Sequence, residues 1–221
     1  MPQAESVEQF HDVAEEPQVR GFLHRPIGQI KGCIALTHGA GGNCQSQLLI
    51  SLATAFAGEG LLVLRFNLPF RQERPTGPPS PGSAARDREG LVRCVSLLEQ
   101  MSQGPVFVGG HSYGGRQATM LAAERPDLVR ALLLLSYPLH PPRRPEQLRT
   151  AHWPKLESPA MFVHGSRDPF GSLVEMESAL RLIPARKLLL PVEGAGHELA
   201  KKASVNDLSE LVVSTFVRFA Q

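Results

Sequence analysis

The sequence lacks any hydrophobic run approaching the ~20 residues of a transmembrane helix, so we expect no membrane span. Its first 16 residues are acidic and contain neither the basic region nor the apolar core of a secretory signal. The formal net charge is only +2, so no overall field favours nucleic acid or a membrane surface as a partner. Together these absences predict a cytoplasmic protein without nucleic acid or membrane partners.

Cysteine is also scarce. The three cysteines, Cys33, Cys44 and Cys94, form no pair at metal-binding or redox spacing, and their odd number argues against a disulfide framework. Cys44 lies near a glycine-rich segment, where we expect an inert small residue. The histidines that follow the predicted strands lack the close spacing of metal ligands. The sequence therefore predicts neither a bound metal nor a cofactor.

What is present is the composition of an ordinary globular protein, 42% hydrophobic and 20% charged. A chain of 221 residues suffices for one domain with a large core. We expect an acidic N-terminal segment over residues 1–17, either a loose start or an edge strand. A single domain without a lid domain should follow over residues 18–221.

Apolar runs alternate with amphipathic helical patterns along this domain. Continuous rather than alternating hydrophobicity indicates strands covered on both faces, and hence a parallel sheet. The fold class predicted is α/β, a three-layer α/β/α sandwich with a mostly parallel, doubly wound sheet. The strand runs are 33–36, 61–66, 105–109, 131–135, 160–163 and 187–192, with a further candidate at Val19–Leu23.

Helix boundaries follow from the same pattern. Ser83 is the expected N-cap of one helix, after a long loop over residues 67–82. Ser172 and Glu175 form a capping box that opens another helix.

The stretch from Gly110 to Gly114 reads Gly-His-Ser-Tyr-Gly, which is the pattern G-x-S-x-G. It lies between the strand at 105–109 and a helical segment at 117–125. In this context the pattern is typical of a strained turn that exposes the hydroxyl of Ser112 as a nucleophile. A plain glycine-rich turn is the alternative interpretation.

A serine, an acid and a histidine each follow a different predicted strand: Ser112, Asp168 and His197. Because parallel strands end at the same edge of a sheet, we expect these side chains to meet there. His197 would take the proton of Ser112, and Asp168 would orient the imidazole. Glu193 is the rival acid, and Asp168 could instead cap the turn before Pro169.

These motifs resemble the α/β-hydrolase superfamily over about residues 30–220. They are His38-Gly39-Ala40-Gly41-Gly42, the serine motif, the Asp168 loop and Gly194-Ala195-Gly196-His197. The sequence is most similar to small lidless members related to dienelactone hydrolases and to a hydrolase-like group found in a chromatin-modifying complex. The usual dienelactone hydrolase has a cysteine nucleophile, so the serine here puts a dienelactone substrate in doubt. The resemblance implies an oxyanion hole formed by the backbone N–H of Tyr113 and that of Ala40 or Gly41.

For the substrate pocket we expect His38, Phe70, Tyr137 and Phe170 as lining residues, with His38 also holding the glycine loop through hydrogen bonds. The segment 137–158 stands where larger relatives insert a lid domain, and it is too short to form one. We therefore expect a shallow site for small, soluble esters.

The arginines near this site have two interpretations. Arg116, in the first turn of a helix, opposes the helix dipole, so we expect a salt bridge to Glu73 or Asp87. An anionic ligand is the other possibility for Arg116. Arg71 and the loop arginines Arg74, Arg143 and Arg144 either are solvated charges or favour an acidic substrate.

The predicted function is that of a serine hydrolase that cleaves small carboxylic esters through an acyl-serine intermediate. Thioesters and small amides use the same machinery, so the residues do not separate them. The alternative is a hydrolase-like interaction module or complex subunit with little or no catalysis. Either a monomer or a homodimer is compatible with the sequence.

Overall fold

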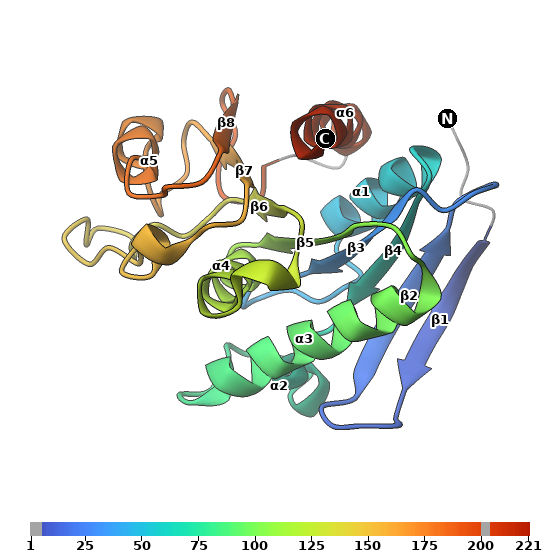
Figure 1. Ribbon diagram of the computed structural model, residues 1–221. Coiled ribbons are helices and arrows are strands. Elements are labelled where there is room, and N and C mark those ends of the chain that lie inside the picture. The colour runs from blue at the N-terminus through green and yellow to red at the C-terminus, as the bar shows by residue number, and fades with distance from the viewer. Residues whose placement is uncertain (1–5, 200–203) are drawn as a thin grey trace.

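One eight-stranded sheet forms the centre of the computed structural model, which describes residues 6–199 and 204–221 (Figure 1). The strand order is β1-β2-β4-β3-β5-β6-β7-β8. Neighbours from β4 to β8 run parallel, whereas β2 is antiparallel to both β1 and β4. The mostly parallel sheet is thus confirmed. The strands are Ser6–Asp12 (β1), Val19–Arg25 (β2), Gly32–Thr37 (β3), Leu61–Phe66 (β4), Val106–His111 (β5), Leu132–Leu135 (β6), Ala160–Gly165 (β7) and Lys187–Val192 (β8).

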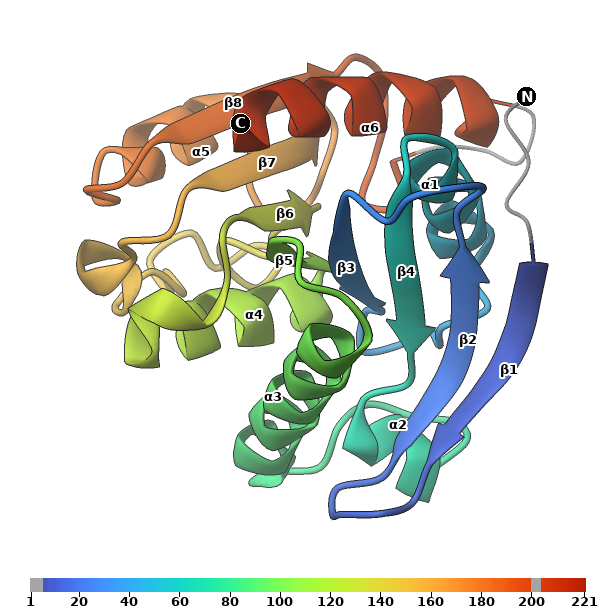
Figure 2. The ribbon, with the colours of Figure 1, turned by 45° about the vertical axis from the view of Figure 1, so that its right-hand side comes forward.

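Helices cover both faces of the sheet, as continuous hydrophobicity in the strands requires. Helices α1 and α6 lie on one face, and α3, α4 and α5 lie on the other (Figures 1 and 2). The α-helices are Gln47–Gly58 (α1), Pro69–Glu73 (α2), Ser83–Met101 (α3), Tyr113–Glu124 (α4), Leu173–Leu180 (α5) and Val205–Ala220 (α6). None of the described helices is long and apolar enough to cross a membrane.

Each face has its own hydrophobic core. Under α1 and α6, the rings of Phe56 and Phe107 both meet Phe216 edge to face. On the other face, Tyr137 and Trp153 pack around Phe162 of β7. These contacts fix the helices on the sheet, and so they fix the loops at the ends of the strands.

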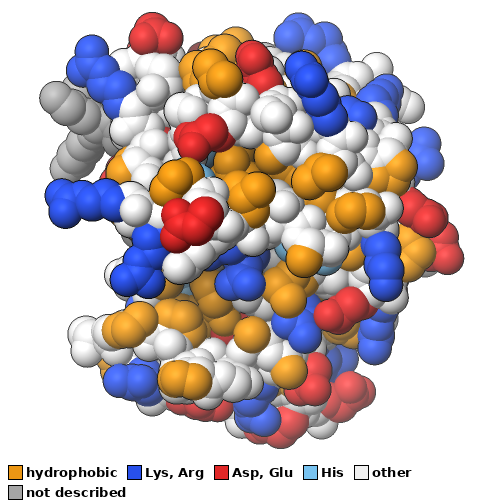
Figure 3. All heavy atoms as spheres, turned by 90° about the vertical axis from the view of Figure 1, so that its left-hand side faces the viewer, with side chains coloured by type: hydrophobic (Ala, Val, Ile, Leu, Met, Phe, Trp, Pro, Cys, Tyr) orange, Lys and Arg blue, Asp and Glu red, His pale blue; other side chains and the backbone are white. Residues whose placement is uncertain are grey.

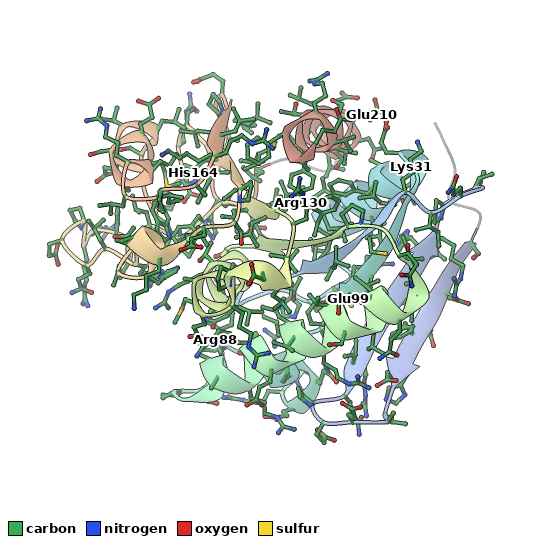
Figure 4. All side chains as sticks on the ribbon, in the orientation of Figure 1. Lys31, Arg88, Glu99, Arg130, His164 and Glu210 are labelled. Carbon is green, nitrogen blue, oxygen red and sulfur yellow. The ribbon has the colours of Figure 1, made fainter. Side chains whose placement is uncertain are left out.

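Polar contacts add to the packing of α3 against α4. Arg88 of α3 donates a hydrogen bond to Glu124 of α4 at 3.2 Å and another to Gln117 at 3.2 Å (Figure 4). The exposed ion pair contributes little to stability, but it joins the helix after the serine motif to its neighbour.

Within the acidic N-terminal segment, whose residues 1–5 lie outside the described chain, Ser6–Asp12 form the edge strand β1, which pairs with β2 along its whole length (Figure 2). The expected edge strand is therefore present, and it belongs to the main sheet.

Two expectations about helix boundaries were wrong. Gly82, with φ +90°, is the N-cap of α3, and Ser83 is its first residue. Ser83 instead donates a hydrogen bond to Asp87, a contact that draws its hydroxyl away from the helix end. The expected loop 67–82 contains a short helix, α2, which begins at Pro69, because proline suits the first turn of a helix. The capping box of Ser172 and Glu175 is confirmed.

Candidate active site

Ser112 lies at a sharp turn between β5 and α4, with φ 50° and ψ −112°. Positive φ is strained for a residue with a side chain, and such strain is frequent at functional sites. A Cβ atom at Gly110 would lie 2.4 Å from the backbone nitrogen of Gly115, and one at Gly114 would lie 2.6 Å from the carbonyl oxygen of His38. The glycines of the motif therefore allow the strand and helix to fold back on each other around the serine.

The three residues expected at the sheet edge lie in direct contact. The Nε2 atom of His197 is 2.8 Å from the Oγ atom of Ser112. Its Nδ1 atom is 2.8 Å and 3.0 Å from the two carboxyl oxygens of Asp168. The side chain of Asp168 is fully buried, and that of His197 is 17% exposed.

Two loops are tied together so that the acid meets the imidazole. The N–H of Arg167 donates to the carbonyl oxygen of Ala195 at 2.8 Å, and the Asp168 carboxyl accepts the N–H of Phe170 at 2.9 Å. The rival acid, Glu193, is exposed and accepts a hydrogen bond from Ser166 instead. The geometry thus favours Asp168 over Glu193.

Two further histidines hold these loops, and neither role was predicted: His164 is fully buried and His111 is half-buried. Nε2 of His111 donates to the backbone carbonyl of His197 at 2.9 Å. Burial lowers the pKa of His111, which favours the neutral ring in this contact. His164 of β7, labelled in Figure 4, donates through Nε2 to the carbonyl of Gly171 at 2.7 Å and so closes the turn that follows Asp168. The signal available was their place in the sequence, directly after or within two residues of the end of a predicted strand.

His38 holds the glycine loop, as expected. Its Nδ1–H donates to the carbonyl of Gly39 at 2.8 Å, and its Nε2 accepts the N–H of Leu68 at 3.1 Å. Burial lowers the pKa of His38 to about 4, so the ring stays neutral and both contacts persist at neutral pH.

Three backbone N–H groups near Ser112 lack an acceptor within the described residues: those of Ala40, Gly41 and Tyr113. Ala40 and Tyr113 are half-buried and Gly41 is exposed, so these N–H groups are open to a ligand oxygen beside the nucleophile. Ala40 and Gly41 line the same pocket as Ser112.

This pocket has a volume of about 520 Å³. Phe170 forms part of its wall, and its ring centroid lies 4.3 Å from that of His197. The apolar lining residues are Ala40, Leu48, Phe170 and Val205. A larger groove of about 860 Å³ runs between α1 and α6, and the described residues that line it include no histidine. The pocket at Ser112 is therefore the candidate active site.

Two residues expected to line the pocket lie in the core. Phe70 is 2% exposed and packs edge to face on Tyr113. Tyr137 is fully buried, and its hydroxyl donates to the carbonyl of Arg149 at 2.6 Å. Both prediction errors have the same cause: a large ring gains more free energy from complete burial than from a place at the rim. Of the four expected lining residues, His38 and Phe170 line the pocket.

The expected salt bridge of Arg116 was also wrong. Glu73 pairs with Arg86 at 3.2 Å. The carboxyl of Asp87 accepts the hydroxyl of Tyr113 at 2.7 Å, together with the N–H of Phe70. These contacts occupy both acids, and Arg116 forms no ion pair within the described chain.

Arg71 does not face an acidic substrate, because its guanidinium is buried and bonded to backbone carbonyls. Cys44 is buried, and burial raises the pKa of its thiol, which agrees with an inert role.

The sheet order, the strained turn at Ser112 and the adjacent histidine and acid define an α/β-hydrolase. Residues 31–220 match the family described as an alpha/beta hydrolase domain, and the chain belongs to this family. A dienelactone hydrolase from Anabaena variabilis has the same fold, with a TM-score of 0.77, 22% identity and coverage of 96% of this chain and 97% of that one. Est1E from Butyrivibrio proteoclasticus, solved with ferulic acid bound, gives a TM-score of 0.78 at 14% identity, over 95% and 98% of the two chains.

A lipase, LipV of Mycobacterium tuberculosis, is 58% identical over 41 residues. This match covers 19% of the present chain and only 16% of the lipase, so the likeness to it is local.

Proposed function

We propose that this protein is a serine hydrolase that cleaves small carboxylic esters through an acyl-serine intermediate. One observation carries the proposal: the unbroken chain of contacts from Ser112 through His197 to the buried carboxyl of Asp168. A serine hydroxyl alone is a weak nucleophile, and an adjacent imidazole held by a carboxylate activates it. The lipase and the dienelactone hydrolase among the similar proteins agree with this chemistry.

In the first half-reaction, Oγ of Ser112 attacks the ester carbonyl carbon while its proton passes to Nε2 of His197. The carbonyl oxygen becomes an oxyanion. The backbone N–H groups of Tyr113 and of Ala40 or Gly41 donate hydrogen bonds to it. Each such donor contributes about 2.7–4 kcal/mol to the transition state. The intermediate then collapses, and the leaving alcohol takes the proton from Nε2.

In the second half-reaction, water attacks the acyl-serine and gives its proton to Nε2 of His197. The resulting oxyanion accepts hydrogen bonds from the same N–H groups. Its collapse releases the carboxylic acid and returns the proton to Oγ of Ser112. Asp168 keeps Nδ1 protonated throughout, so that Nε2 is free to act as base and then as acid.

The pocket supports small substrates. Its volume of about 520 Å³ lies within the usual range for small-molecule sites. The segment 137–158 folds into the core through Tyr137 and Trp153 and contributes no lid. Because no segment among the described residues 6–199 and 204–221 encloses a long acyl chain, short-chain esters and thioesters are the favoured class.

The alternative role, a hydrolase-like subunit without catalysis, would be supported by a large apolar surface for a partner. On the face shown in Figure 3, apolar side chains lie among charged ones. That distribution is ordinary for a protein surface, so this face does not favour the alternative.

The test is hydrolysis of chromogenic esters with acyl chains from acetyl to decanoyl. We expect the highest kcat/KM with the short chains and a loss of activity in Ser112→Ala. Ser214→Ala, which changes a serine on α6 bonded to Leu211, should retain full activity. Equal activity of Ser112→Ala and the wild type would contradict the proposal.

A further inference from the structure

Arg71 is a buried cation without a carboxylate partner. The residue is 5% exposed, and no described acid lies within ion-pair distance of its guanidinium. Its nitrogens instead donate to backbone carbonyl oxygens on both sides. These are Gly42 at 2.8 Å, Ala40 at 2.7 Å, Arg74 at 3.0 Å and Gly77 at 2.9 Å.

These hydrogen bonds fix the orientation of the glycine loop. The C=O and N–H of a trans peptide point in opposite directions. Because the carbonyl of Ala40 points to Arg71, the N–H of Gly41 in the same peptide points away from it. That N–H has no acceptor within the described chain, and Gly41 lines the pocket of Ser112.

The preceding peptide is held in the same manner by neutral donors. The carbonyl of Gly39 accepts Nδ1–H of His38 at 2.8 Å and the N–H of Gly42 at 3.1 Å. The N–H of Ala40 is thereby turned in the opposite direction. Two consecutive peptides are therefore anchored by their carbonyls, and only the second is anchored by a charge.

Burying a charge without a counterion costs folding free energy, so such a charge usually has a functional role. Here the positive charge lies behind a peptide whose N–H can receive a developing negative charge. A cation bonded to the carbonyl oxygen polarises that peptide and strengthens its N–H as a donor.

We infer that Arg71 is a positioning residue for the oxyanion hole, acting through the peptide between Ala40 and Gly41. This inference rests on the proposed function of Ser112. Arg71 does not touch the substrate. It holds and polarises the donor, so its effect should appear in the transition state more than in substrate binding.

The experiment compares ester hydrolysis by the wild type, Arg71→Lys and Arg71→Met. In Arg71→Met we expect kcat to fall about 10- to 100-fold and KM to change by less than about threefold. This loss is smaller than the fall in kcat of about 10²- to 10³-fold that follows the removal of one oxyanion-hole donor, because the donor is still present. Arg71→Lys keeps the positive charge but loses the planar set of N–H donors of the guanidinium. Its kcat should lie between those of the wild type and Arg71→Met. Affinity for a boronic acid that forms a tetrahedral adduct with the serine should fall in parallel with kcat.

Chemical rescue separates this role from a purely structural one. In Arg71→Ala, guanidinium below its denaturing concentration should restore part of kcat, and methylammonium should restore less. Arg93→Met is the matched control, because Arg93 is also buried, is bonded to Asp12 at 2.9 Å and lies on α3 outside the pocket. It should lower the unfolding temperature without lowering kcat.

The possible outcomes distinguish the two proposals. A wild type that hydrolyses no ester and forms no adduct would overturn the proposed function, and this inference with it. An active wild type with folded Arg71→Lys and Arg71→Met variants of unchanged kcat would overturn this inference alone. If Arg71→Met does not fold, an undiminished kcat in Arg71→Lys and no guanidinium effect on Arg71→Ala would also overturn it.

Discussion

Nε2 of His197 lies 2.8 Å from Oγ of Ser112, although 85 positions separate the two residues in the sequence. The serine follows β5 and the histidine follows β8, and two strands of the sheet lie between these elements. The loop after β8 must therefore reach back along the sheet edge. Its backbone hydrogen bond to Arg167 and the contact of its carbonyl with His111 hold it in that position.

The acid of this arrangement can be tested by Asp168→Asn. An amide cannot enforce the imidazole tautomer that leaves Nε2 free, so kcat should fall by about 10⁴-fold. Steady-state kinetics with a short-chain ester measure this loss. Glu193→Gln is the matched control and should be fully active. A larger loss in Glu193→Gln than in Asp168→Asn would assign the role to the other acid.

Tyr113→Phe removes the hydroxyl that donates to Asp87 at 2.7 Å. The buried carboxyl loses a partner, and we expect the free energy of unfolding to fall by about 1–3 kcal/mol. The backbone N–H of Tyr113 remains, so kcat should change little. Tyr137→Phe, which removes a bond to a neutral carbonyl, should cost less, about 1 kcal/mol. Urea unfolding of the variants measures the difference, and equal losses would contradict this account.

Acid should destabilise the protein through His38. Burial lowers the pKa of His38 to about 4 from an ordinary value of 6.5, so protons bind more tightly to the unfolded chain. Its contribution to stability is complete above pH 6.5 and is lost as the pH falls toward 4, at up to about 1.4 kcal/mol per pH unit. Burial also lowers the pKa of His24 and His152 to about 4, and both act in the same direction.

Denaturant unfolding from about pH 7 to about pH 4.5 measures this slope. His38→Gln should reduce it, because one titrating group is lost. A slope that is unchanged in His38→Gln would show that other groups cause the acid sensitivity.

The turn at the serine tolerates no side chain at Gly110. A Cβ there would meet the backbone of α4 at 2.4 Å, so Gly110→Ala must push the helix from the strand. We expect a loss of stability of about 1–3 kcal/mol or more. Gly41→Ala, where a Cβ meets nothing within 4 Å, is the control for stability. Thermal unfolding compares the two, and equal melting temperatures would contradict the packing argument.

The features predictable from sequence were those with a local cause. The apolar runs predict the strands, because a buried parallel strand needs apolar side chains on both faces. The order of Ser112, Asp168 and His197 after different strands predicts their meeting, since parallel strands end at one edge.

The remaining features depend on contacts between distant segments. No local pattern distinguishes Phe70, which is buried, from Phe170, which lines the pocket. Arg71 was expected to be a charge on a loop. The carbonyls that surround its guanidinium come from a segment some 30 positions earlier and from the turn that follows it, so no local pattern reveals them. The sequence offered Asp87 as a partner for Arg116, but in the fold the carboxyl of Asp87 accepts the hydroxyl of Tyr113.

The central claim is that Ser112 is an activated nucleophile. The most direct test is to incubate the protein with a fluorophosphonate and to locate the adduct by mass spectrometry, with Ser112→Ala and His197→Ala in parallel. We predict a single adduct on Ser112 that is absent in Ser112→Ala and strongly slowed in His197→Ala. Folded wild-type protein that remains unlabelled, or labelling that persists in Ser112→Ala, would contradict the claim.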